Sequence, residues 1–265
     1  MQMKDAVIVS AVRTAVARGK KDGGLATVHP IDLSAEVLRA VVQRVHFNPA
    51  LVDDVLWGCA MPEGAQGLNV ARMGVLRAGF PVEVSAATVN RFCSSGLQTV
   101  AMAAQSIMTG LCDVVIAGGV EMMSNVPMGG HHTRLHPEMI EDNIGMGFTA
   151  ERVARQWGIT RDQADDFALG SQQKAATAIQ RGAFAGEIAP VPVQRVSWKG
   201  GKKSTETTQF AVDELVRAET TREGLGKLKP AFAAKGVVTA GNSSPLSDGA
   251  SALLMMSADK AKELG

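Results

Sequence analysis

The sequence has no surplus of charge and no long apolar run, and each absence excludes a class of protein. Its 265 residues carry 27 Lys and Arg against 26 Asp and Glu, a formal net charge of +1. A nucleic-acid-binding surface usually needs an excess of Lys and Arg on one face, so we expect no nucleic-acid partner. No apolar run approaches the roughly 20 residues that span a bilayer, and the opening MQMKDAVIVSAVRTA is charged too early for a signal peptide. We therefore expect a cytoplasmic protein that binds no membrane.

Cysteine is also scarce, because the chain has only Cys59, Cys93 and Cys112. An odd number at wide spacing matches neither a disulfide framework nor paired zinc ligands. Cys59 and Cys112 lie in apolar segments, where thiols commonly pack as small hydrophobic groups. Cys93 differs, because NRFCSSG places it at the entrance of a predicted helix.

Strand and helix patterns alternate over residues 1–120. The β-branched run DAVIVSAV predicts a buried strand, and apolar residues at helical spacing in IDLSAEVLRAVVQRV predict the helix that follows. Further strands are expected at 53–61, 85–90 and 113–119, and further helices at 69–80 and after Cys93. Such alternation favours a largely parallel sheet covered by helices, in which ligands collect at the carboxyl ends of the strands. Cys93 comes just past one such end.

Residues 121–232 predict an insertion into this sheet. Their first part is rich in Met, Gly and Pro and has no sustained period, and a helix follows from the capping box of Thr160 and Gln163 to a stop at Gly182. The polar stretch 198–215 is expected to be a loop. The apolar pattern returns within 236–257, which predicts a fifth strand before a last charged helix. We expect a mixed, mostly parallel five-stranded sheet with helices on both faces, formed by residues 1–120 with 233–265.

Three other patterns have simpler interpretations. GGKKST lacks the spacing of a phosphate-binding loop, because a second lysine stands where Ser or Thr is needed. His131, His132 and His136 have no Cys or carboxylate at ligand spacing, so we expect loop histidines and no metal site. The methionines of the insertion suit either an adaptable apolar wall or ordinary core packing. They are Met122, Met123, Met128, Met139 and Met146.

The position of Cys93 allows nucleophilic chemistry as well as packing. The start of a helix presents unpaired N–H groups and the positive end of the macrodipole, which favour thiolate over thiol. The same amides, with the N–H of Cys93 as the first donor, suit the oxyanion of a tetrahedral intermediate. Ser94, Ser95 and Gly96 are small enough to let a substrate approach the backbone.

Three stretches of the chain resemble the thiolase family. VNRFCSSGLQTVAMAAQSIMTGLCDVVIAGGVEMMSNVPM is similar to the thiolase segment that carries the acyl-accepting cysteine, MGFTAERVARQWGITRDQADDFA to the helices of its loop domain, and KLKPAFAAKGVVTAGNSSPLSDGASALLMMS to the return into the sheet. The likeness covers the whole chain. VLWGC and EGAQGLNVAR favour the degradative 3-ketoacyl-CoA thiolases over the biosynthetic acetoacetyl-CoA enzymes.

The resemblance implies an acetyl-CoA C-acyltransferase that uses coenzyme A as substrate and needs no metal or redox cofactor. Cys93 would accept an acyl group from a 3-ketoacyl-CoA and pass it to incoming CoA. Arg217 matches a residue near the adenine and phosphate end of CoA, and Gly145 stands where biosynthetic members often have histidine. The positions that match the pantetheine tunnel are Met146, Phe232, Ala240 and Ser244.

The motifs of a second thiolase half are not found in the sequence. The family's Asn-Glu-Ala-Phe, Gly-His-Pro and Cys-x-Gly-x-Gly segments are missing, so we expect the C-terminal thiolase domain to be absent. The helix after Cys93 has few polar residues and would need cover on nearly every side, so an exposed apolar face should attract a complementary half or another copy. A non-catalytic CoA-binding fragment, a biosynthetic acetyltransferase and, more remotely, a ketoacyl synthase stay open as alternatives.

Overall fold

The computed structural model describes residues 3–132, 134–140 and 144–265, with the backbone alone at Lys199. The chain forms two compact units. The sheet unit comprises residues 1–131, 187–214 and 246–265, and the inserted unit comprises residues 132–186 and 215–245. No helix in the described ranges has the length and apolar character needed to cross a membrane.

From α1 to β5, the elements of the sheet unit alternate between helix and strand as the sequence predicts. In chain order they are β1 (Ala6–Arg13), β2 (Ala17–Arg18), α1 (Pro30–Gln43), β3 (Asp54–Gly58), α2 (Val70–Ala78), β4 (Ser85–Val89), α3 (Ser95–Met108), β5 (Val114–Met122), β6 (Val191–Lys199), β7 (Lys202–Phe210), β8 (Ser247–Ser257) and α7 (Ala258–Leu264). The inserted unit has α4 (Met146–Trp157), α5 (Arg161–Gln180) and α6 (Arg222–Gly226). Short 3₁₀ turns lie at Pro49–Leu51, Gly64–Gln66 and Pro137–Met139.

The main sheet is mixed, with most strands running the same way. Its order is β1-β8-β5-β3-β4, and the two-residue β2 pairs with β8 as a sixth strand among the described residues. β3 is parallel to both β4 and β5, whereas β8 is antiparallel to β1 and β5. The predicted mixed, mostly parallel sheet is therefore confirmed, with β2 added to the five expected strands.

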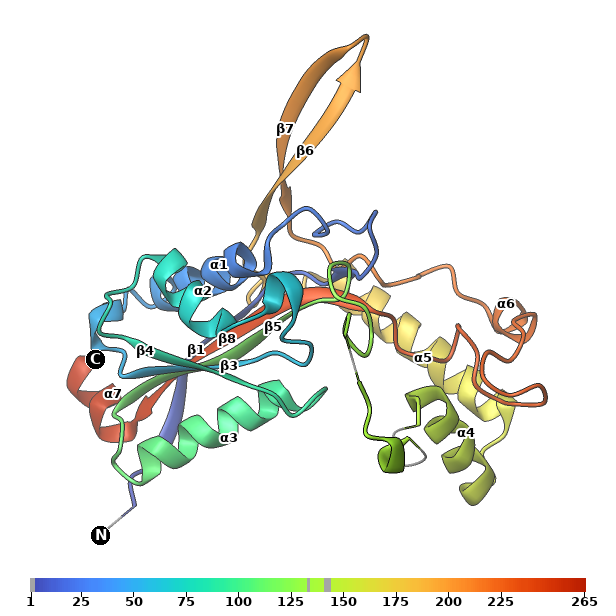
Figure 1. The fold of residues 1–265 in the computed structure, drawn as a ribbon, viewed down its shortest axis with the longest axis horizontal. Coiled ribbons are helices and arrows are strands. Elements are labelled where there is room, and N and C mark those ends of the chain that lie inside the picture. Colours follow the sequence, from blue (N-terminus) through green and yellow to red (C-terminus); the bar gives the residue numbers. More distant parts are fainter. Residues whose placement is uncertain (1–2, 133, 141–143) are drawn as a thin grey trace. The chain divides into compact units, whose positions relative to one another are not determined.

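Helices cover both faces of this sheet, with α1 and α2 on one face and α3 on the other (Figure 1). Because successive side chains of a strand point to opposite faces, Val55 and Trp57 pack in the core beneath α1 and α2, whereas Leu56 packs toward α3. In β5, Ile116 likewise packs in the core beneath α1 and α2, and Val115 packs toward α3. Burial on both faces explains why these strands read as continuous apolar runs.

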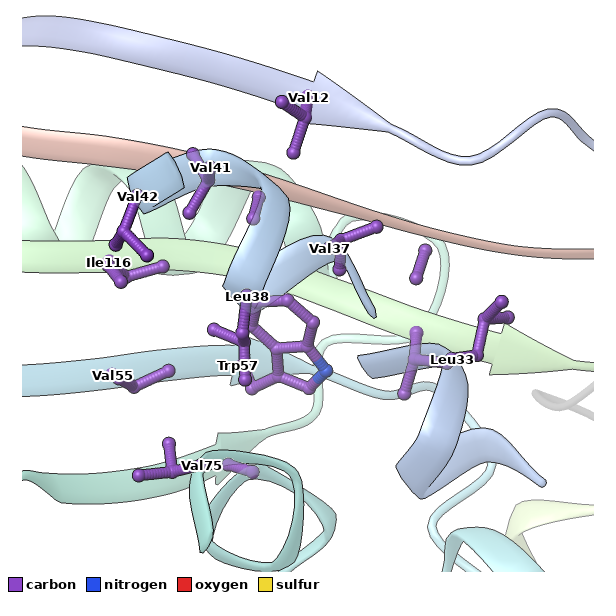
Figure 2. Packing of buried hydrophobic residues seen from close by; sticks show 14 of the residues in the cluster. Val12, Leu33, Val37, Leu38, Val41, Val42, Val55, Trp57, Val75 and Ile116 are labelled. Carbon is purple, nitrogen blue, oxygen red and sulfur yellow. The ribbon is translucent and has the colours of Figure 1, made fainter. Parts of the chain in front are cut away.

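Trp57 occupies the centre of the larger core. Its indole ring is fully buried and lies among Leu33, Leu38 and Val55 (Figure 2). The indole Nε1–H donates to Ser34 Oγ at 3.2 Å, so the one polar atom of the ring is satisfied. This bond links the Trp57 ring of β3 to Ser34 of α1.

Helix α3 is covered on one side only within this chain, as expected for a helix whose remaining cover would come from a partner. Ser95, Thr99, Ala103 and Ile107, spaced four residues apart, are buried against the sheet. Leu97 is 74% exposed. The expected exposed apolar side chain is present, but the buried stripe is narrow and half polar, because the first turns pack backbone against backbone.

The polar stretch 198–215, expected to be a loop, is instead largely strand. β6 and β7 pair from Val191↔Phe210 to Lys199↔Lys202, and the two residues between them, Gly200 and Gly201, both have positive φ, at 57° and 77°. Such a two-residue turn matches the twist of an antiparallel hairpin. Because polar residues occupy both faces of the ribbon, the sequence shows no alternation of apolar and polar residues there. The Gly200-Gly201 pair was the one local sign of a hairpin turn.

The hairpin belongs to the sheet unit, so the boundaries of the compact units differ from those expected. Arg13 explains the difference. Its backbone carbonyl accepts the N–H of Ala189 at 2.8 Å before the hairpin, and its guanidinium binds Asp213 at 2.7 Å after it. At the other boundary, residues 233–245 belong to the inserted unit, where the N–H groups of Val237 and Val238 donate hydrogen bonds to the Glu151 carboxylate. In that unit, the predicted capping box of Thr160 and Gln163 on α5 is confirmed.

Replacing Trp57 with alanine should lower the free energy of unfolding by about 3–5 kcal/mol, because the change leaves a large cavity in the core. Trp198→Ala is the matched control in the same unit, since that ring is 69% exposed, and it should change the free energy by less than about 0.5 kcal/mol. Urea unfolding followed by circular dichroism measures both. Equal losses in the two variants would contradict the central role of Trp57.

Candidate functional site

Cys93 lies in a tight turn between β4 and α3, at the carboxyl edge of the parallel strands. β4 ends at Val89, α3 begins at Ser95, and Cys93 is exposed. Phe92, directly before it, has φ of 47°, in the left-handed region that non-glycine residues rarely adopt. The backbone reverses there and presents the thiol at the start of the helix.

Ser95 holds this turn together. Its Oγ accepts the N–H of Arg91 at 2.9 Å and donates to the carbonyl of Phe92 at 2.6 Å. The N–H of Ser95 also donates to the Phe92 carbonyl, at 3.0 Å. A single buried serine therefore holds both the N–H of the residue before Phe92 and the carbonyl of Phe92 itself.

Glycines let the start of α3 lie directly on the strands. A Cβ added at Gly58, the last residue of β3, would lie 2.9 Å from the Cβ and carbonyl carbon of Ser95. A Cβ at Gly119 of β5 would lie 2.6 Å from the carbonyl oxygen of Gly58. Since real Cβ atoms do not approach so closely, larger residues at these positions would displace the helix entrance that carries Cys93.

The first turn of α3 has unpaired donors. The Ser94 side chain makes no capping bond. Within the described ranges, the backbone N–H groups of Gly96 and Leu97 also have no hydrogen-bond partner, and the ladder of α3 starts with Gln98 N–H to Ser94. Unpaired N–H groups at a helix start favour an anion nearby.

The other two thiols have different surroundings. Cys59 is buried, and burial, reinforced by the charge of Glu121, raises its pKa to about 12. Cys112 is half-buried against the core beneath α3, and its pKa is raised by burial and by Asp53. Both therefore stay protonated near neutral pH and pack as small hydrophobic groups, as predicted.

In the inserted unit, two of the residues predicted to bind CoA lie by the first turn of α4. Met146 begins the helix and is exposed. Phe232 packs edge-on against Phe148, with ring centroids 5.9 Å apart. A Cβ at Gly147 would lie 2.3 Å from the Phe232 ring, so only glycine lets the ring sit there. Gly145, the position that matches histidine in biosynthetic thiolases, precedes α4.

Ala240 and Ser244 lie exposed in the loop that returns toward β8. Two acidic residues and an asparagine hold this loop. Glu151 accepts the N–H groups of Val237 and Val238. Asn242 donates to Asp165 at 2.8 Å and accepts the N–H of Thr239 at 2.8 Å, while Asp165 pairs with Arg161 at 2.7 Å. Sequence reasoning missed these supports, because their partners lie far away along the chain.

Arg217, the predicted contact of the adenine and phosphate end, is exposed on the same unit. Its backbone N–H donates to Gln172 of α5 at 2.8 Å. No hydrogen bond in the described part of the chain joins it to the other four predicted residues. The structure thus brings Met146 and Phe232 to one helix end, puts Ala240 and Ser244 in one loop, and leaves Arg217 separate.

The patterns given simpler interpretations have ordinary surroundings. GGKKST forms the tip of the β6–β7 hairpin. His136 Nδ1 accepts the N–H of Glu138, and the N–H of His131 donates to Glu63. Across the described residues, no group of three His, Cys, Asp or Glu side chains is arranged to hold a metal ion. Of the methionines, Met122 is in the core, which confirms ordinary core packing for that residue, and Met128 is exposed.

Comparisons with known proteins agree over the whole chain. Residues 6–259 match a family model described as the thiolase N-terminal domain. The 3-ketoacyl-CoA thiolase of Bacillus subtilis is 48% identical over 268 residues, and the acetyl-CoA acetyltransferase of Pseudomonas aeruginosa is 43% identical over 281 residues; each match covers 99% of this chain and 68% of the relative. The crystal structure of the Bacillus anthracis acetyl-CoA acetyltransferase aligns with a TM-score of 0.85 at 37% identity, over 99% of this chain and 68% of that one. The chain thus spans about two thirds of these relatives.

Replacing Phe92 with asparagine should raise the free energy of unfolding by about 0.5–1 kcal/mol, because asparagine tolerates the left-handed region and the phenyl ring is 66% exposed. Phe167→Asn, at an exposed site inside α5, should give no gain. Denaturant unfolding measures both. A loss in Phe92→Asn as large as in the control would show that the ring stabilises the turn.

Asp248, at the start of β8, should make stability depend on pH. It is buried, and one of its oxygens has no hydrogen-bond partner among the residues that the structure describes. Burial raises its pKa above the ordinary 3.8 despite the bond from Ser124. The folded state therefore holds this proton more tightly than the unfolded state, so the contribution is complete below pH 3.8 and is lost as pH rises through the raised pKa. The melting temperature of Asp248→Asn relative to the parent should accordingly be higher at pH 7 than at pH 4. A difference that does not change with pH would refute this role.

Proposed function

Because the chain belongs to the thiolase family, we propose that it carries the acyl-accepting cysteine of a 3-ketoacyl-CoA thiolase. The observation that supports this most directly is the exposed thiol of Cys93 at the start of α3. The other two thiols are kept protonated by burial and nearby carboxylates, so neither suits the task.

The reaction proceeds in two acyl transfers. The Cys93 sulfur attacks the C3 carbonyl carbon of a 3-ketoacyl-CoA, the bond between C2 and C3 breaks, and the C2 carbanion takes a proton and leaves as acetyl-CoA. The acyl group stays on sulfur as a thioester. A second CoA loses its thiol proton and attacks that thioester, which releases the shortened acyl-CoA and restores the Cys93 thiolate.

Backbone donors near Cys93 stabilise the charge that develops in these steps. The oxyanion of each tetrahedral intermediate is held by the N–H of Cys93, and the unpaired first-turn donors of α3 add positive potential. The transfer of an acyl group from one sulfur to another involves no redox change. Coenzyme A therefore acts as a substrate, and no cofactor is required.

The inserted unit binds the CoA. Met146, Phe232, Ala240 and Ser244 line the path of the pantetheine arm, and Arg217 meets the adenine and phosphate end. The bonds from Glu151 and Asn242 support this assignment, because they hold the loop around Ala240 in one conformation before ligand arrives.

Turnover needs groups that the printed sequence does not contain. A histidine to activate the thiol and a second cysteine to move protons come from the remaining third of the thiolase fold, in a longer chain or a companion chain. The exposed apolar side of α3, with Leu97, is where this complementary half or a second copy packs. The partners are therefore CoA, acyl-CoA and a protein of the same family, in the cytoplasm.

Incubation with radiolabelled acetyl-CoA tests the acyl transfer. Label should appear on Cys93, vanish in Cys93→Ala and persist in Cys112→Ala, the matched control on the same unit. Peptide mass spectrometry locates the label, and calorimetry measures CoA binding. Binding of CoA without label, also after a complementary half is added, would contradict acyl transfer and favour a non-catalytic CoA-binding fragment.

A further inference from the structure

A chain of hydrogen bonds joins the ends of three parallel strands around the Cys93 turn. β3, β4 and β5 all end at the same edge of the sheet, and each contributes one link. The links are the segment after β3 at residues 59–66, Asn90 directly after β4, and Glu121 near the end of β5. No role in the site for Asn90, Gln66 or Glu121 was predicted from the sequence.

Glu121 organises the segment after β3. Its carboxylate accepts the N–H of Ala60 at 2.7 Å, the N–H of Met61 at 3.3 Å and the side-chain amide of Gln66 at 2.8 Å. Gln66 is fully buried, donates also to the Met61 carbonyl at 2.8 Å, and accepts the N–H of Met122. Two acceptor oxygens thus fix the direction of the Ala60 peptide.

Asn90 connects the Ala60 peptide to the residue before Cys93. Its amide donates to the carbonyl of Ala60 at 3.1 Å, and its Oδ1 accepts the N–H of Phe92 at 2.8 Å. The second bond holds Phe92, the residue before Cys93, in the left-handed conformation. Because φ of 47° is unfavourable for phenylalanine, the Phe92 backbone would relax if this bond were lost.

We propose that Glu121 and Asn90 are positioning residues for Cys93, acting in series through the Ala60 peptide. Glu121 fixes Ala60, Ala60 fixes the amide of Asn90, and Asn90 fixes Phe92, so the thiol stays over the first turn of α3. The inference rests on the proposed function only where acyl transfer is concerned. The positioning of the thiol itself stands on the contacts alone.

The alkylation rate of Cys93 by iodoacetamide, read by peptide mass spectrometry, tests the positioning without reference to any substrate. Asn90→Ala and Glu121→Gln should each lower that rate by about threefold, because a displaced thiolate loses the field of the helix start. The double variant should be no slower than the slower single variant, since both changes break the same series of contacts. The rate of Cys112 in the same samples should not change.

Asn48→Ala is the matched control. Asn48 also accepts an N–H two residues on, from Ala50 at 3.1 Å, but it lies before β3, at the opposite edge of the sheet. Its removal should leave the Cys93 rate at the parental value. Asn90→Ser, which keeps an acceptor for the Phe92 N–H and loses the donor to Ala60, should recover part of the rate and serves if the alanine variant does not fold.

The outcomes separate this proposal from the proposed function. Parental Cys93 rates in Asn90→Ser, Asn90→Ala and Glu121→Gln, or losses that add in the double variant, would overturn the series. So would a parallel change at Cys112, which would indicate general loosening. Acetyl transfer from acetyl-CoA is measured in the same variants: a parent that is alkylated at Cys93 but never acetylated refutes acyl transfer and leaves the positioning result intact.

Discussion

Backbone packing between the start of α3 and the end of β3 decides where the Cys93 sulfur lies. Gly58 touches Ser95, and Gly119 touches Gly58, so helix and strands meet without intervening side chains. The buried Thr99 adds a bond to the Gly118 carbonyl at 3.1 Å. This close approach fixes the start of α3 against the ends of β3 and β5, and the turn containing Phe92 connects β4 to that point.

Two cysteines at the same end of the sheet have opposite surroundings. Cys59 follows β3 and lies 4.0 Å from the Glu121 carboxylate, which together with burial keeps its proton on. Cys93 follows β4, is exposed, and faces a helix start instead of a carboxylate. Two thiols at one end of the sheet thus have different surroundings, one buried beside a carboxylate and one exposed at a helix start.

Much of the sheet unit was predictable because its signals are local. Apolar periodicity placed β1, α1, β3, β4, α3 and β5 within a few residues, and the capping box placed the start of α5. Cys93 stood out for the same reason, since a thiol among small residues at a helix entrance is a short pattern. The β6–β7 hairpin was missed because its exposed ribbon has no apolar face.

The supports of the candidate site could not be predicted, because they are polar contacts between distant residues. Glu121 meets Ala60 across 61 positions, and Asn242 meets Asp165 across 77. Nothing periodic marks such pairs, and each residue alone suits an ordinary surface site. Only the folded arrangement shows that these side chains hold their loops by hydrogen bonds.

The path of the backbone between the two units limits how the protein can be altered. The sheet unit takes residues from three separate stretches and the inserted unit from two, so the polypeptide passes from one to the other four times. The β6–β7 ribbon, anchored by Arg13, interrupts the insertion halfway. The inserted unit therefore cannot be exchanged between homologues as a single segment, because recombination would have to join the chain correctly at four junctions.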